Sequence, residues 1–86
     1  MSDSPFEEAN EVGAQFLITE LDLAKTFLDE ADVVKEPAQA EVSRRYAQKA
    51  YDTVLRFLPK LNLTDEERET INEKLALVGG LLSRGL

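Results

Sequence analysis

Apolar residues recur along most of this chain in alternating steps of four and three, a spacing that places side chains on one face of an α-helix. In the first third of the chain the main apolar stripe comprises Leu17, Leu21, Ala24, Leu28 and Ala31. A second row lies about 100° around the same helix and comprises Ala9, Phe16, Leu23 and Phe27. This apolar arc is wider than one partner requires, so we expect two neighbouring helices to fill it.

Capping residues and prolines mark the ends of this first helix. Ser4 is a capping residue, Pro5 occupies the first helical position, where no N–H is needed, and Glu7 completes a capping box. The apolar periodicity lapses after Ala31, and Pro37 permits a second helix to start. The pattern therefore predicts a first helix over about residues 5–31.

The second predicted helix has one apolar face that is rich in small residues, which allow another helix to approach closely. Its members are Ala40, Ala47, Ala50, Tyr51, Val54 and Leu58, with Phe57 at its margin. Pro59 disfavours further helix by roughly 3 kcal/mol, because proline removes a backbone hydrogen bond and clashes with the preceding turn. We expect this helix to span about residues 37–58.

A third helix is predicted over about residues 64–84, after a loop in which Leu61 and Leu63 are expected to tuck under the turn. Its start is marked by a capping box formed by Thr64 and Glu67. Its apolar stripe comprises Ile71, Leu75, Val78 and Leu82.

Glycines interrupt the end of this stripe. Gly79 and Gly80 each cost a helix interior about 1 kcal/mol relative to alanine, so we expect the last turn to fray or end there. If the helix continues, Gly85 is placed to cap it.

Three amphipathic helices joined by short connections predict an all-α fold, an antiparallel up-down-up three-helix bundle. The 86 residues are expected to form a single domain over residues 1–86. A chain of this length buries only roughly 60 to 65% of its unfolded surface, so we expect modest stability.

The net charge of −7 argues against nucleic acid and anionic membrane as partners, because both are bound through Lys and Arg. There is no cysteine, no basic start followed by an apolar run, and no run of 18 apolar residues, so a cytoplasmic location is expected. The middle helix is mildly basic between two acidic ones. Its cations either complement the neighbouring helices or form a basic strip, Arg44, Arg45 and Lys49, that receives an acidic partner.

The sequence lacks both histidine and cysteine, and with them the usual general base, the thiol nucleophile and the preferred zinc ligands. The acidic clusters Glu7, Glu8 and Glu11, and Asp29, Glu30 and Asp32, are expected at solvated helix ends. No calcium loop, phosphate-binding glycine loop or dinucleotide fingerprint occurs. We therefore predict no enzymatic activity, no catalytic residue, no metal site and no cofactor; a carboxylate-based hydrolase or metal binder is the minor alternative.

The order Ala47, Tyr51, Val54 and Pro59 resembles the second helix of a tetratricopeptide repeat. In length, helix count and Ala-x-x-x-Tyr spacing, the chain more closely resembles microtubule-interacting-and-transport (MIT-like) domains. Those domains bind short helices of partner proteins in grooves between their own helices, and the resemblance implies a similar role here. The alternative explanation is core packing, which by itself favours a small, then an aromatic, then an aliphatic residue on one face of a tightly packed helix.

These observations predict a non-enzymatic domain for protein–protein interaction or self-association, with a helical segment or a second copy as partner. Leu77 and Leu81 lie one turn apart and outside the stripe of the third helix, and Ile18 lies outside the main arc of the first. With the basic strip, these residues are the candidate partner-binding positions, and a homodimer is a possible outcome. The alternative is a small accessory or regulatory subunit of an enzyme complex.

Overall fold

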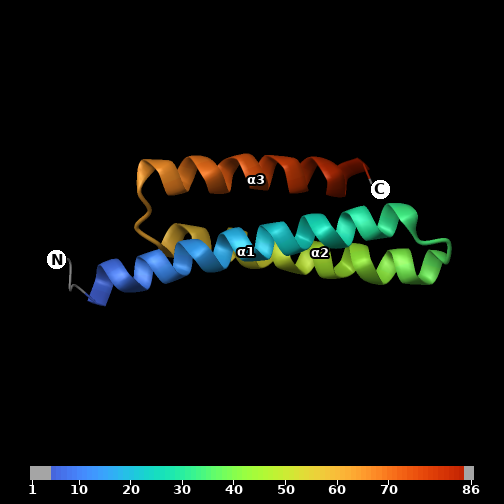
Figure 1. Cartoon of the computed structure of the whole chain (residues 1–86), viewed down its shortest axis with the longest axis horizontal. Coiled ribbons are helices and arrows are strands. Elements are labelled where there is room, and N and C mark those ends of the chain that lie inside the picture. Colours follow the sequence, from blue (N-terminus) through green and yellow to red (C-terminus); the bar gives the residue numbers. More distant parts are fainter. Residues whose placement is uncertain (1–4, 85–86) are drawn as a thin grey trace.

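The computed structural model describes the backbone of residues 5–84 and the side chains of residues 12–84. Helix α1 (Pro5–Val33) is followed by α2 (Pro37–Phe57), the short 3₁₀-helix η1 (Leu58–Lys60) and α3 (Asp65–Arg84). Each α-helix packs against the other two, α2 running antiparallel to α1 and α3 (Figure 1). The part of the chain that is described contains no strand, and the predicted all-α three-helix bundle is confirmed.

The helix ends follow the capping residues and the prolines. Helix α1 continues two residues beyond the expected Ala31, and α2 begins at Pro37 as expected. Regular α-helix ends at Phe57, and Pro59 lies within η1, because a proline in the next α-helical turn would remove a hydrogen bond. The proposed cap at Ser4 lies outside the described residues.

The capping box at the start of α3 is present. The Thr64 backbone N–H donates to Oε1 of Glu67 at 2.9 Å, and the Glu67 N–H donates to Oγ1 of Thr64 at 3.1 Å. Acidic residues fill the first turn, where the helix dipole favours negative charge.

Of the two outcomes left open at Gly79 and Gly80, an end at the glycines does not occur: α3 continues through both to Arg84, the limit given for the third helix from the sequence. Leu81 and Leu82 beyond the glycines pack against the core, and this packing offsets the low helix propensity of glycine. Gly85, the proposed cap, lies outside the described residues.

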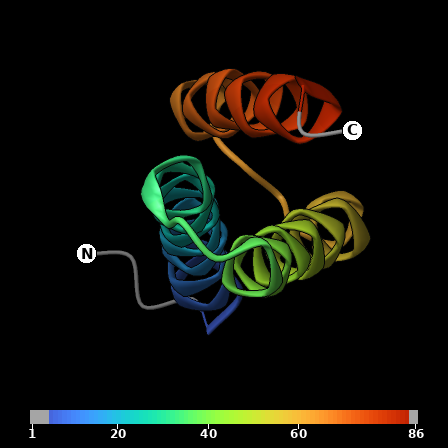
Figure 2. The ribbon, with the colours of Figure 1, turned by 90° about the vertical axis from the view of Figure 1, so that its right-hand side faces the viewer.

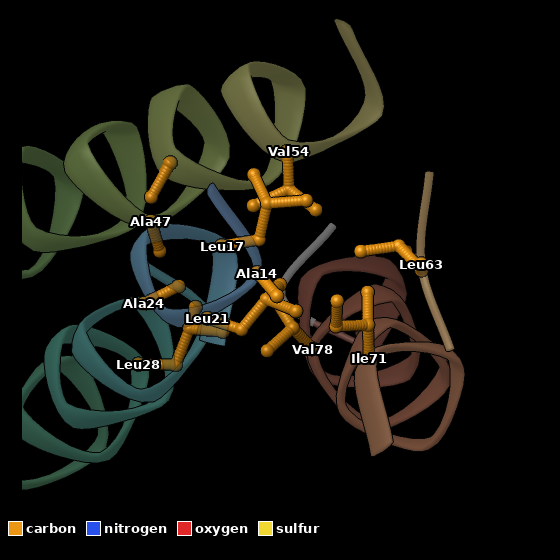
Figure 3. Close-up of a cluster of buried hydrophobic side chains, with 11 residues drawn as sticks. Ala14, Leu17, Leu21, Ala24, Leu28, Ala47, Val54, Leu63, Ile71 and Val78 are labelled. Atoms are coloured by element: carbon orange, nitrogen blue, oxygen red, sulfur yellow. The ribbon is translucent and has the colours of Figure 1, made fainter. Parts of the chain in front are cut away.

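The core is apolar throughout, and no polar or charged side chain is buried among the described residues. Figure 3 shows side chains from all three helices converging, together with Leu63 from the loop before α3. The main stripe predicted for α1 is buried along its whole length, which confirms it. Leu61 packs against α1 at Gly13, where an added Cβ would lie 2.7 Å from Cδ2 of Leu61.

The bundle is long and narrow, with extents of 51 × 18 × 18 Å. Seen along its length in Figure 2, α3 lies on one side of the pair formed by α1 and α2, and within residues 5–84 no helix covers the opposite side of that pair. None of the helices in the described residues combines the length and the hydropathy that a membrane-spanning segment needs.

Candidate protein-binding groove between α1 and α2

Large apolar side chains are exposed on the side of the α1–α2 pair that faces away from α3. Leu23 of α1 and Tyr46 of α2 line the groove on this side, and helical spacing places the exposed Val12 and Phe16 in line with Leu23, and the exposed Val42 and Phe57 in line with Tyr46. The flanks that face α3 are marked by Asp22 of α1, which binds Lys74 of α3, and by Tyr51 of α2, which lies against Gly79.

Two rows of side chains run side by side along this face. The row on α1 is Phe16, Glu20, Leu23 and Phe27, and the row on α2 is Tyr46, Ala50, Thr53 and Phe57. Both rows advance in steps of four, three and four, the spacing of a helix-packing stripe. Each helix therefore has a second packing stripe in addition to the one that faces the core.

The middle of this face is an open groove of about 530 Å³. It is lined by Glu20, Leu23, Phe27, Tyr46, Lys49, Ala50, Asp52, Thr53 and Arg56. We call this groove, extended by Phe16 and Phe57, the outer groove. Ala50 is buried at its floor, so a side chain placed above it can come close to the helix backbone.

Aromatic rings lie at both ends of the outer groove. At one end Phe27 and Tyr46 stack with ring centroids 5.4 Å apart and an interplanar angle of 30°. Phe16 and Phe57 are each eleven residues from that pair, in opposite chain directions on antiparallel helices, so they lie at the same height at the other end. Nζ of Lys60 lies 5.2 Å from the ring centroid of Phe57.

The two rims of the outer groove differ in charge. The α1 rim has Glu20, whereas the α2 rim has Lys49 and Arg56. Asp52, the acid on the α2 rim, accepts a hydrogen bond from Gln48 at 2.9 Å. Among the described residues, Glu20, Lys49 and Arg56 form no ion pair.

Arg44, Arg45 and Lys49, for which the sequence left open either pairing with neighbouring helices or a basic strip, do not all lie on one side of α2. Lys49 lines the outer groove, Arg45 pairs with Glu41 of its own helix at 3.0 Å, and Arg44 lies 4.0 Å from Asp32 of α1. Five residues turn a helix through about 140° beyond one full turn, so Arg44 and Lys49 lie on different sides of α2. Two of the three cations thus complement acidic residues within the chain.

Arg44 instead lines a small hollow of about 110 Å³ at the end of the bundle where α1 meets α2. Its other lining residues are Leu28, Asp32, Leu81 and Arg84. The hollow joins all three helices and holds the Arg44–Asp32 ion pair.

The prediction that Leu77 and Leu81 form an exposed apolar strip is wrong for one of the two residues. Leu77 is 47% exposed, but Leu81 is partly buried against the core. Leu81 lies three residues after the buried Val78, and this places it beside Leu28 of α1 rather than in solvent.

Ile18 is likewise not left outside the bundle. It packs against the core, because α3 covers that flank of α1, as the bond between Lys74 and Asp22 one turn further along demonstrates.

The second apolar row of α1 has the opposite outcome. Two neighbouring helices were expected to fill the whole apolar arc of this helix. In this row Phe27 packs against the core, but Phe16 remains 47% exposed and Leu23 44% exposed. Ala9 of the same row lies outside the described side chains. Tyr46, which completes the groove on α2, was not among the sequence candidates; its spacing to Ala50, Thr53 and Phe57 is the signal that would have found it.

No metal-binding arrangement is present among the described side chains, where no three acidic residues gather closely enough to hold an ion. Asp29 pairs with Lys25 at 2.8 Å, and Asp32 pairs with Arg44. The side chains of the other acidic cluster, Glu7, Glu8 and Glu11, lie outside the described residues.

No family model, no curated protein and no solved structure matches this chain. In the segment that resembles the tetratricopeptide and MIT-like helices, Ala47 and Val54 are buried in the core and Tyr51 faces α3. Core packing accounts for that order of residues, and kinship with either family stays a prediction that rests on residues 47–59.

Proposed function

We propose that this chain is a non-enzymatic protein-interaction domain that binds an amphipathic helix along the outer groove. The observation that carries the proposal is the exposure of Phe16 and Leu23 in one row of α1, beside a main apolar stripe that is buried along its whole length. Covering such side chains removes apolar surface from water, which is favourable by roughly 25 cal/mol per Å². Contiguous exposed apolar patches of this kind mark interaction surfaces in soluble proteins.

The arrangement of the outer groove favours a helix as the ligand. Its two rows have the spacing of four and three that accepts the side chains of a third, parallel-lying helix between them. Ala50 at the floor leaves room for a large residue of that helix, and the aromatic pairs at both ends provide large apolar contacts. The resemblance to MIT-like domains, which bind helices between their own helices, agrees with this mode of binding.

Affinity capture from the source cell tests the proposal with two matched variants. Leu23→Glu places a charge in the outer groove, whereas Leu77→Glu places the same charge on α3. The two leucines have nearly equal exposure, 44% and 47%, so the general effects of the substitution are matched.

We expect a defined protein to be retained by the wild type and by Leu77→Glu, and to be lost with Leu23→Glu. Retention by Leu23→Glu together with loss in Leu77→Glu would move the binding surface to α3 and contradict the proposal. Circular dichroism of both variants establishes that the bundle is intact.

A further inference from the structure

We infer that the helix bound in the outer groove is supplied by a second copy of this chain, so that two α1–α2 pairs pack face to face in a homodimer. This inference rests on the proposed function and identifies its partner. The arrangement has a two-fold axis parallel to the helices, midway between the two faces. Helix α1 of each copy then lies antiparallel to α2 of the other, and the four helices form an antiparallel bundle.

The apolar rows of the outer groove are self-complementary under this symmetry. A rotation about an axis along the helices keeps every residue at its own height. Phe27 therefore meets Tyr46 of the partner subunit at one end, and Phe16 meets Phe57 of the partner subunit at the other. In the middle, Leu23 lies over the alanine floor formed by Ala50 of the partner subunit.

The charges on the rims select this arrangement. Glu20 is seven residues from Phe27, and Thr53 is seven residues from Tyr46, so Glu20 is level with Thr53 of the partner subunit. Lys49 and Arg56 lie one turn to either side of Thr53. Each Glu20 carboxylate is thus placed between two cations of the other copy. Asp52, the acid on the same rim, accepts a hydrogen bond from Gln48 of its own helix, and the rim keeps a net positive charge.

The alternative two-fold axis, perpendicular to the helices, lays α1 on α1 and α2 on α2. It brings the acidic rims together and the basic rims together, and like charges across an interface are unfavourable. With the axis parallel to the helices, the acidic α1 rim of each copy instead faces the basic α2 rim of the other. A second copy therefore supplies the opposite charge at both rims of the outer groove.

The size of the face and the composition of the core support a dimer. The 21 residues of α2 extend about 32 Å, and the bundle is 18 Å wide. Two such faces together bury on the order of 1,000 Å², the lower limit for specific interfaces. Of the thirteen buried hydrophobic residues described, six are alanines, so the monomer core is small and gains from further apolar burial.

Charge reversal tests both the association and its geometry by sedimentation equilibrium of the full chain. We expect the wild type to be dimeric. Glu20→Lys alone sets like charges against Lys49 and Arg56, and the double variant Lys49→Glu, Arg56→Glu sets like charges against Glu20. Each is expected to raise the dimer Kd by roughly tenfold or more.

An equimolar mixture of these two variants is the decisive sample. In a mixed dimer the lysine introduced at position 20 of one variant meets the two glutamates introduced in the other, so this contact has its charges exchanged. The second contact is native, because Glu20 of the double variant meets Lys49 and Arg56 of the single variant. The mixture is therefore expected to form dimers that neither variant forms alone. Leu77→Glu is the control and is expected to keep the wild-type mass. Thermal unfolding followed by circular dichroism verifies that every variant is folded.

Three outcomes overturn the inference. A wild type that remains monomeric up to about 1 mM has no self-association of useful strength. A wild-type dimer that is insensitive to the charge reversals, or a mixture that stays monomeric, excludes the proposed axis. If the wild type is monomeric but affinity capture through Leu23 succeeds, the proposed function stands and only the identity of the partner is wrong.

Discussion

Small residues determine how closely the three helices approach one another. Alanines from α1 and α2 make up much of the interface between these helices, and Gly79 brings α3 against Tyr51 of α2. An added Cβ at Gly79 would lie 3.1 Å from the Tyr51 hydroxyl oxygen, whereas one at Gly80 would meet nothing within 4 Å. The two adjacent glycines therefore differ in role, although both have the same low helix propensity.

Gly80→Ala is expected to stabilise the domain by about 1 kcal/mol, because alanine loses less conformational entropy in a helix and no neighbour is displaced. For a domain of this size this corresponds to a rise in Tm of roughly 4–8 °C. Gly79→Ala is expected to gain less, because the Tyr51 side chain must move. Urea unfolding of both variants measures the difference, and equal gains at the two positions would show that the contact with Tyr51 has no energetic weight.

A Tyr51→Phe background provides the control for that contact. Without the hydroxyl, Gly79→Ala is expected to gain nearly as much as Gly80→Ala. The resulting double-mutant cycle isolates the interaction between positions 51 and 79 from the change in helix propensity.

At the scale of the elements, local signals position the helix ends. The capping box of Thr64 and Glu67 satisfies backbone groups at the start of α3 that have no partner within the helix. Proline sets the other limits, at Pro37 and Pro59. These signals involve residues within four positions of each other, and for that reason they are readable from the sequence alone.

Thr64→Ala is expected to destabilise the domain by about 1 kcal/mol, because the Glu67 N–H loses its acceptor. Thr26→Ala is the matched control: the Thr26 hydroxyl donates to the Asp22 carbonyl within α1, at 3.1 Å, and caps nothing. This control is expected to be neutral or slightly stabilising, because alanine is the better helix former. Equal losses in the two variants, measured by urea unfolding, would argue against a capping role for Thr64.

At the scale of the whole molecule, the fold leaves one face of the α1–α2 pair without a covering helix. Helices α2 and α3 bury the main stripe of α1 and Ile18 packs against the core, but Phe16 and Leu23 are exposed on the other side. The three described helices leave these side chains uncovered, and a partner that covers them is expected to add stability, because it removes apolar surface from water.

The thermal stability of the wild type is therefore expected to depend on protein concentration. A second copy that binds the folded chain but not the unfolded chain raises the apparent stability by mass action. The Tm should therefore rise as the protein is concentrated. The Tm of Leu23→Glu is expected to be lower than that of the wild type at high concentration and to change little on dilution. Scanning calorimetry across about two decades of concentration measures this. A wild-type Tm that is constant over that range would contradict self-association through this face.

The sequence by itself determined the helical class, the approximate helix limits, the core-facing stripes and the capping box of α3, because each depends on residues within a few positions of one another. Only the tertiary structure decided which flanks of these helices are covered. Leu81 and Ile18 became part of the packing, Phe16 and Leu23 stayed exposed, and the cations of α2 pointed to different sides. Coverage depends on how each helix is rotated about its own axis and on where α3 docks, and residue spacing along a single helix does not contain that information.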